Sequence, residues 1–123
     1  MTDWRATGIG FLTIVVLSVF GVVAPGLGQL TAGLIGGFVA GYLAGGGLGS
    51  GFWHGLLAGS LGGIIAGVIL TLVVAVAGFA LGPAGAAISS VVGAGIFLVA
   101  VVLAVVMALE SAVAGALGAA INP

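Results

Sequence analysis

Four long apolar runs, separated by short stretches of glycine and proline, make up most of this chain. Each run is apolar for about 18 residues or more, whereas β-barrel spans alternate apolar and polar residues over about 10 residues. The pattern therefore predicts an all-α fold, a polytopic transmembrane bundle that forms a single domain over residues 1–123. The predicted spans cover approximately residues 6–23, 27–44, 53–80 and 88–109.

Three turn sequences separate the predicted spans. Pro25 with its neighbouring glycines predicts the first turn, the glycine-rich segment 45–51 the second, and 82–85 the third. The third run, 52–81, exceeds the length of one upright span, so it tilts or its last turns emerge from the membrane. The tail 111–123 either extends the fourth helix or folds back along the membrane surface.

A count of three spans is the alternative, with the first helix cleaved as a signal peptide or lying flat. The first apolar run is long for a signal-peptide core, and Pro25 directly follows the small residue Ala24. A proline at that position makes a poor cleavage site. We therefore expect the first helix to be retained.

Composition excludes a water-soluble fold. Hydrophobic residues make up 63% of the chain and charged residues 2%, whereas a soluble domain carries about 25% charged residues. Lipid must therefore cover most of the surface and is the first expected partner. The chain has no basic patch, which argues against nucleic acid, and no cysteine, which excludes disulfides and thiolate metal sites.

Glycine rows are the second unusual feature, because 26 of the 123 residues are glycine. Glycines recur every fourth residue in the second and third spans, at Gly33, Gly37, Gly41 and Gly45, and at Gly51, Gly55, Gly59, Gly63 and Gly67. Such spacing places them on one helix face, where another backbone can approach closely. The simplest arrangement is a hairpin over 27–80 whose two grooves face each other. In the alternative, one or both grooves face another subunit.

The few polar residues define the expected orientation and one candidate polar face. Arg5 is the only Lys or Arg, so the positive-inside rule predicts cytoplasmic N- and C-termini in a four-span protein. Four spans also place the N-terminus, the second turn and the end of the fourth span at one interface. That interface would hold Asp3, Arg5, His54 and Glu110, with Trp4, Tyr42 and Trp53 as an aromatic belt.

Glu110 and His54 are the candidates for chemistry on this face. Glu110 near mid-membrane would suit an ion or proton site, but we favour a position at the helix end. His54 either titrates near neutral pH or pairs with Glu110, and we favour a simple interfacial role. One His and one Glu are too few ligands for zinc, and no nucleophile and base can be paired. We therefore expect no metal, no cofactor and no catalysis.

The segments 33–46 and 51–60, together with the opening residues 1–6, resemble a family of small glycine-rich membrane proteins from halophilic archaea. The resemblance covers about the first two thirds of the chain and implies a four-span protein in a haloarchaeal cell membrane. That family carries only a domain-of-unknown-function label, so it transfers no activity and no functional residue. The C-terminal third departs into Val- and Ala-rich sequence.

Three functional hypotheses follow. The first is a structural or accessory membrane protein that forms a homo-oligomer, or docks to another membrane protein, through its glycine faces. The second is a small channel or ion carrier that uses Glu110, with a loose similarity to the proteolipids of ATPase rotors. The third is a protein that binds a lipid or a carotenoid-type ligand in its small-residue grooves.

Overall fold

The computed structural model describes residues 1–21, 23 and 27–123. These residues form four helices: α1 (Trp4–Gly21), α2 (Leu27–Ala44), α3 (Leu48–Ala80) and α4 (Gly82–Ile121). All four are long and apolar enough to cross a membrane. This confirms the predicted all-α, four-span fold and makes the chain a multi-pass membrane protein. The turn predicted at Pro25 lies outside the described residues, as do Val22, Ala24 and Gly26.

The second turn is shorter than predicted. Gly45, Gly46 and Gly47 have φ values of 58°, 75° and 90°, a backbone region that side chains disfavour. These three residues make the whole turn, and α3 begins at Leu48 instead of near residue 53. The remaining glycines of the predicted loop belong to the first turn of the helix.

The fourth helix is much longer than predicted. It begins at Gly82, and Leu81 alone separates it from α3. Pro83 lies in its first turn. Proline suits that place because the first helical N–H groups have no partner within the helix. At the other end α4 continues to Ile121, so the tail extends the helix and does not fold back along the surface.

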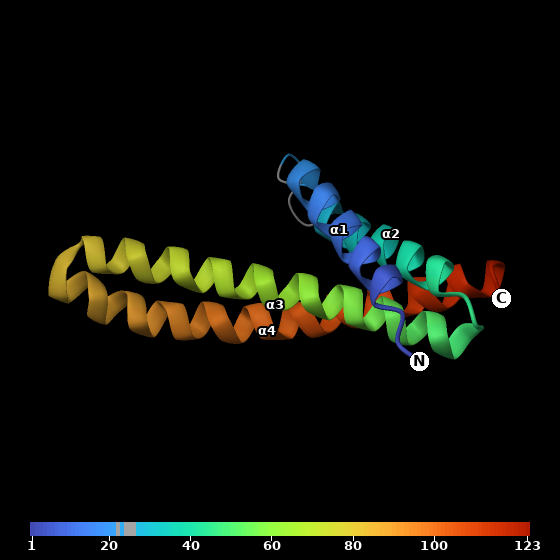
Figure 1. The fold of residues 1–123 in the computed structure, drawn as a ribbon. Coiled ribbons are helices and arrows are strands. Elements are labelled where there is room, and N and C mark those ends of the chain that lie inside the picture. The colour runs from blue at the N-terminus through green and yellow to red at the C-terminus, as the bar shows by residue number, and fades with distance from the viewer. Residues whose placement is uncertain (22, 24–26) are drawn as a thin grey trace.

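The helices form two hairpins of very different length (Figure 1). Helices α1 and α2 have 18 residues each, whereas α3 has 33 and α4 has 40. At 1.5 Å per residue these lengths are about 27, 27, 50 and 60 Å. The α1–α2 hairpin lies across one end of the α3–α4 hairpin and diverges from it, while the rest of the long hairpin projects alone.

Two regions of the molecule therefore differ in their surroundings. We call "the crossing" the helices α1 and α2 together with residues 48–62 and 107–121 of the long hairpin. We call "the distal hairpin" residues 63–106, which lie beyond Gly62 and Met107. A Cβ at Gly62 would lie 3.3 Å from Ile14 of α1, and one at Gly33 of α2 would lie 4.0 Å from the Met107 carbonyl oxygen.

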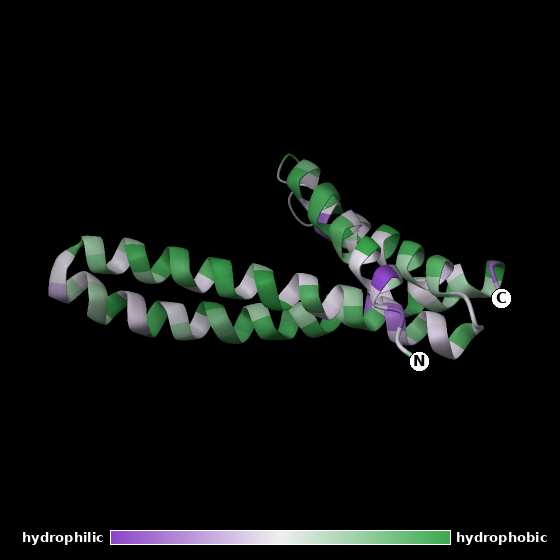
Figure 2. Ribbon diagram, viewed as in Figure 1, coloured by the Kyte–Doolittle hydropathy of each residue, from purple (hydrophilic) through white to green (hydrophobic). Residues whose placement is uncertain are grey.

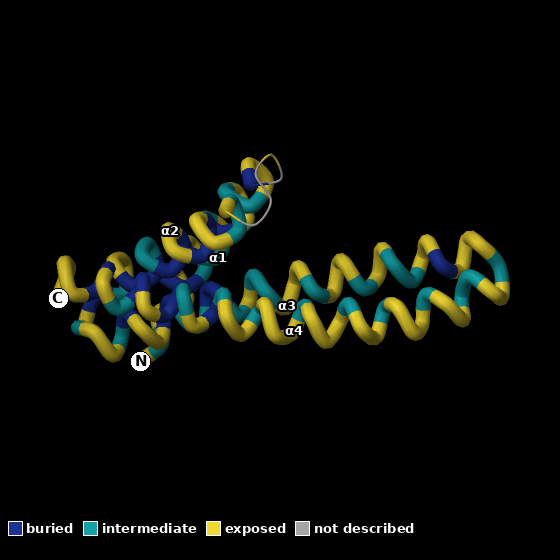
Figure 3. The backbone as a smooth tube through the Cα atoms, turned by 180° about the vertical axis from the view of Figure 1, so that it is seen from behind, coloured by how far each residue is buried: buried dark blue, intermediate teal, exposed yellow. Residues whose placement is uncertain are grey.

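The crossing contains nearly all the buried residues, as the dark blue segments of Figure 3 show. Its buried apolar side chains are almost all alanine, with Ile14 as the exception. The largest fully buried side chains are polar: His54, Thr7 and Ser111. A core of alanine and glycine brings the helix backbones close together, which is the usual basis of helix packing in membranes.

The distal hairpin is apolar and largely exposed on both helices (Figure 2). The hydroxyls of Thr71, Ser89 and Ser90 donate hydrogen bonds to carbonyl oxygens of their own helices. The hydrogen-bonding capacity of these hydroxyl groups as donors is therefore satisfied within the helix, without water. The surface that remains is one of aliphatic and aromatic groups.

Candidate functional site

The two predicted glycine rows both pack against α4. A Cβ added at Gly37 or Gly55 would overlap the carbonyl oxygen of Ser111. A Cβ added at Gly41 or Gly51 would overlap the carbonyl oxygen of Gly115. The α4 backbone therefore lies between the grooves of α2 and α3. The prediction that the two grooves face each other is wrong, because a third helix fills both of them.

Contact between the α3 row and α4 is close as far as Gly63 and becomes ordinary at Gly67. A Cβ at Gly59 would lie 2.7 Å from the Ser111 Cβ, and one at Gly63 would lie 2.6 Å from the Ala104 Cβ. At Gly67 the nearest atom is the Ala100 Cβ, at 4.0 Å, which is an ordinary contact. Gly33, at the other row's end, is equally loose, and Gly45 belongs to the turn.

The surface of α4 that fills the grooves was missed by the sequence analysis. It consists of small residues at spacings of three and four, the same signal that identified the glycine rows. Because alanine and serine make up most of it, the segment appeared to be generic membrane sequence. Its members are Ala104, Ala108, Ser111, Ala112, Gly115 and Ala119.

Helix α2 carries a second small-residue face, which packs on α1. A Cβ at Gly10 would lie 2.5 Å from the Ala40 Cβ and 2.7 Å from the Gly36 carbonyl oxygen. Near the open end of this hairpin, a Cβ at Gly21 would lie 3.0 Å from the Gly28 carbonyl carbon. Helix α2 is thus held closely on two sides, by α1 and by α4.

One buried side-chain hydrogen bond joins the long helices inside the crossing. The Ser111 hydroxyl donates to the Gly55 carbonyl oxygen over 2.8 Å, and Ser111 is fully buried. The absence of a side chain at Gly55 lets the hydroxyl reach that oxygen. Hydrogen bonds of this kind in membrane bundles contribute about 0.6 kcal/mol on average.

His54 fastens the N-terminal segment to α3. The Asp3 backbone N–H donates to His54 Nε2 over 2.7 Å, and His54 Nδ1 lies 2.7 Å from the Ser50 carbonyl oxygen. An N–H can only donate and a carbonyl oxygen can only accept, so the ring is neutral with its proton on Nδ1. Trp53 adds a second link, because its Nε1–H donates to the Thr2 hydroxyl over 3.0 Å.

The Asp3 carboxylate caps the first helix. Its Oδ1 accepts hydrogen bonds from the backbone N–H groups of Arg5, at 2.9 Å, and Ala6, at 3.2 Å. A side-chain oxygen at this position satisfies donors that have no partner within the helix. Asp3 therefore has a defined structural role at the start of α1.

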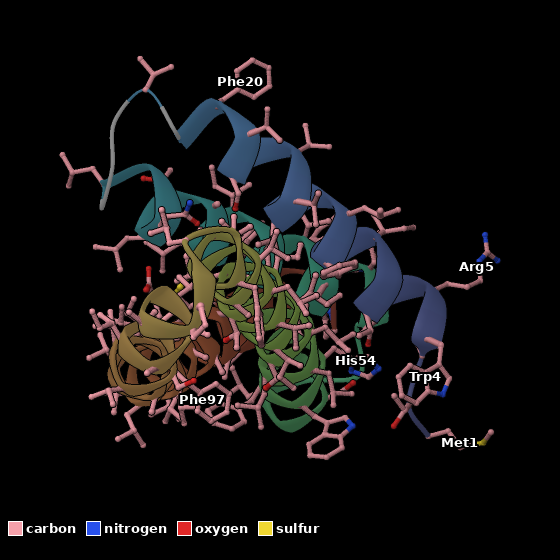
Figure 4. The ribbon with its side chains drawn as sticks, turned by 90° about the vertical axis from the view of Figure 1, so that its left-hand side faces the viewer. Met1, Trp4, Arg5, Phe20, His54 and Phe97 are labelled. Atoms are coloured by element: carbon pink, nitrogen blue, oxygen red, sulfur yellow. The ribbon has the colours of Figure 1, made fainter. Side chains whose placement is uncertain are left out.

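The three residues of the predicted polar face do not form one cluster. Arg5 is exposed and points away from His54 (Figure 4). Glu110 is half-buried on α4, and α4 continues to Ile121, which is about 17 Å further along the axis. The prediction that Glu110 marks the helix end is therefore wrong. Within the described residues, the hydrogen bonds of His54 involve neither Arg5 nor Glu110.

The predicted meeting of the chain ends with the second turn is confirmed. The contacts of Asp3 and Thr2 with α3 bring the N-terminus to this end of the long hairpin. The Asn122 side-chain amide donates to the Tyr42 carbonyl oxygen over 2.8 Å and brings the C-terminal end to α2. Among the described residues, no group of three or more His, Asp or Glu side chains could hold a metal ion.

Two apolar grooves flank the seam between α3 and α4. One has a volume of about 530 Å³, and the other, of about 480 Å³, is also lined by Gln29 and Leu30 of α2. The grooves share a floor of small residues, so the seam is thin and can be approached from both sides. This floor consists of Gly63, Gly67, Ala100 and Ala104.

Comparison with known proteins identifies a family and no activity. Neither the curated proteins nor the solved structures contain a match to this chain. A family of unknown function, DUF5518, matches residues 4–121. The matched segment begins at the first residue of α1 and ends at the last residue of α4. This four-helix membrane protein therefore belongs to the DUF5518 family of unknown function.

Proposed function

We propose that this protein is a non-enzymatic structural or accessory protein of the cell membrane that pairs with a second copy of itself through the distal hairpin. One observation carries the proposal: the distal hairpin is apolar and largely exposed, and it belongs to helices, α3 and α4, that are longer than a bilayer needs. The resemblance of residues 33–46 and 51–60 to haloarchaeal proteins supports a haloarchaeal cell membrane as its location.

Helix length separates the two hairpins. Helices α1 and α2, at about 27 Å, match the hydrocarbon core of a bilayer, which is about 30 Å thick. Placing all 33 residues of α3 within that thickness would require a tilt of about 50°, beyond the usual range of membrane helices. A second protein chain can cover apolar residues that lipid does not reach.

The shape of the distal hairpin suits contact with another helix. The exposed side chains that line its 530 Å³ groove include Ile64 and Phe97, which are 60% and 48% exposed. Between such side chains lies the floor at Gly67 and Ala100, where a helix from outside can approach the backbone closely. A second copy of the chain offers exposed apolar ridges of the same kind, and a two-fold symmetric pair forms a closed dimer with no free surface for adding further copies.

The glycine rows themselves are not the proposed contact surface. Gly37, Gly41, Gly51, Gly55 and Gly59 all face α4 within the same chain. Only the distal ends of the α3 row border the open grooves, at Gly63 and Gly67. The association surface proposed from the sequence therefore moves from the rows to the distal hairpin.

A second candidate function is the binding of an apolar chain, such as a lipid tail or a carotenoid-type molecule. The 530 Å³ groove lies within the range of small-molecule sites, about 300–1,000 Å³. Co-purification of a stoichiometric lipid or pigment would support it, and a colourless, lipid-free preparation would count against it. No comparable observation favours an ion carrier, because Glu110 is a single half-buried carboxylate.

Pairing is tested by co-expressing two copies with different C-terminal tags that lack lysine and arginine. We expect each tag to recover the other from membranes dissolved in mild detergent. Gly67→Leu should reduce recovery at least tenfold, because it fills the groove, whereas the nearest atom to its Cβ, at 4.0 Å, permits normal folding.

Gly49→Leu is the matched control for this experiment. Gly49 also lies on α3, outside the distal hairpin, and a Cβ there meets nothing within 4 Å. Recovery should therefore equal that of the wild type. Absence of pairing in the wild type, or equal losses in the two leucine variants, would contradict the proposal.

A further inference from the structure

We propose that the two copies of the pair lie in the membrane in opposite orientations, one turned over relative to the other. This inference rests on the proposed function, because it specifies how the second copy is placed. The partner is a second copy of this chain whose crossing covers the distal hairpin of the first. Two observations support the inverted arrangement: the distribution of charge and the uneven width of the molecule.

Charge gives the chain almost no preferred orientation. Orientation follows the distribution of Lys and Arg in the short segments near membrane spans, and acidic residues contribute little. The 123 residues contain one such side chain, Arg5, and the connecting segments 22–26 and 45–47 and residue 81 contain none. The two faces of the membrane therefore differ by a single Lys or Arg side chain.

His54 does not add to that charge. It is 2% exposed, and its two ring nitrogens hold the Asp3 N–H and the Ser50 carbonyl oxygen, an arrangement that requires the neutral ring. Asp3, whose backbone N–H donates to the ring, is the one residue with a charged side chain among the hydrogen-bond partners of His54 in the described part of the chain. Apart from the N-terminal amine, Arg5 alone supplies a positive charge at this end of the molecule, and one charge is a weak determinant of orientation.

Shape favours the inverted pair over a parallel one. The crossing contains parts of all four helices, whereas the distal hairpin contains only α3 and α4, and it projects alone from the wider end of the molecule (Figure 1). Two copies in the same orientation meet at their wide ends, which holds their distal hairpins apart. Turning one copy over places each distal hairpin beside the partner's crossing, and the two-fold axis then lies in the membrane plane.

Inverted pairing predicts that both ends of the molecule reach both sides of the membrane. The chain lacks cysteine, so Thr2→Cys and Ala84→Cys each introduce a single thiol, at opposite ends of the long hairpin. In sealed vesicles of one orientation, a membrane-impermeant maleimide should label about half of each variant. Full labelling of one variant with none of the other would overturn the inverted arrangement.

Added lysines give a test that also reports on pairing. Leu48, at the start of α3, is 61% exposed, and Ala84, at the other end of the hairpin, is exposed. Leu48→Lys gives its end of the molecule two cationic side chains with Arg5, and the combination Arg5→Gln, Ala84→Lys and Ala87→Lys gives the other end two, since Ala87 is also exposed. The two variants should each give one orientation, opposite to one another, and each alone should lose pairing. Co-expression of the two variants should restore the pair, which shows that neither set of substitutions damages the fold.

Ala84→Glu is the control, because a carboxylate should leave the orientation mixed and the pair intact. If each lysine variant adopts one orientation and still pairs with itself, the pair is parallel. In that case this inference fails and the proposed self-association stands. If wild-type copies do not recover one another at all, the proposed function and this inference both fail.

Discussion

The crossing and the distal hairpin are built from similar residues, yet only in the crossing do other helices of the same chain cover the small-residue faces. In the crossing, Gly37 and Gly55 lie against Ser111, and small residues from three helices exclude lipid from the contact. In the distal hairpin the same α3 row continues, but α2 reaches only its first turns, where Gln29 and Leu30 line one groove. The difference shows that a small-residue face becomes a core only where a further helix is long enough to reach it.

The largest effect should come from one methyl group on α4. A Cβ at Gly115 would overlap the Gly51 carbonyl oxygen and lie 2.9 Å from the Gly55 Cα, and backbone atoms cannot easily move aside. We expect Gly115→Ala to lower the free energy of unfolding by about 3 kcal/mol. Unfolding by SDS in mixed micelles, followed by the fluorescence of Trp4 and Trp53, measures this change.

Gly95→Ala is the matched change in the distal hairpin. Gly95 lies on the same helix, and a Cβ there meets nothing within 4 Å. Its effect on the free energy of unfolding should stay below about 1 kcal/mol, the size of a helix-propensity difference. Equal effects of the two alanine substitutions would remove the distinction between the regions.

An intermediate effect is expected at the edge of the crossing, where His54 holds the N-terminal segment. Arg5 provides the only trypsin site, and the adjoining Ala6 is buried. His54→Ala removes the acceptor for the Asp3 N–H, which costs about 1–2 kcal/mol. Trypsin should therefore cleave the detergent-solubilised variant about 5- to 30-fold faster than the wild type.

Trp53→Phe separates this link from its neighbour. It removes only the hydrogen bond to Thr2 at an exposed position, so its acceleration of cleavage should be smaller. Unchanged cleavage of His54→Ala would show that the ring does not hold the N-terminal segment.

The smallest effect compares two serines of α4. The Ser111 hydroxyl bonds across helices to Gly55, whereas the Ser90 hydroxyl bonds to Ala86 of its own helix. Ser111→Ala should cost about 0.6 kcal/mol of unfolding free energy, measured in the same SDS titration. Ser90→Ala should change it by less than half of that, and a larger loss at Ser90 would contradict the assignment of the tertiary hydrogen bond to Ser111.

Hydropathy predicted the helices well, because lipid imposes a minimum apolar length on any span. The bounds of α2 were predicted correctly, since the Gly45–Gly47 turn ends it sharply. The length of α4 was underestimated because Glu110 appeared to mark the end of the helix, yet the next residue, Ser111, still belongs to the packed part of α4. In the structure Ser111 is fully buried and hydrogen-bonded, and a polar residue with a partner does not end a span.

The glycine rows illustrate what a sequence pattern leaves open. Spacing shows that Gly41 and Gly51 lie on smooth helix faces, but any backbone of suitable path can fill such a face. Because α2 and α3 are neighbours along the chain, the sequence favoured packing of the α2 groove on the α3 groove. In the structure, Gly115 of α4 fills both grooves. The partner depends on the path of the whole chain, and the small residues of α4 were the only local signal for it.

The central claim is that the helix faces of the crossing are covered within one chain, whereas those of the distal hairpin are covered by a second copy of the chain. Native mass spectrometry of the complex, extracted from its own membrane in mild detergent, tests it most directly. The chain has a mass of 11.6 kDa, so we expect a species of twice that mass in the wild type and its loss in Gly67→Leu. A wild-type species that carries only one chain under the mildest extraction would contradict it.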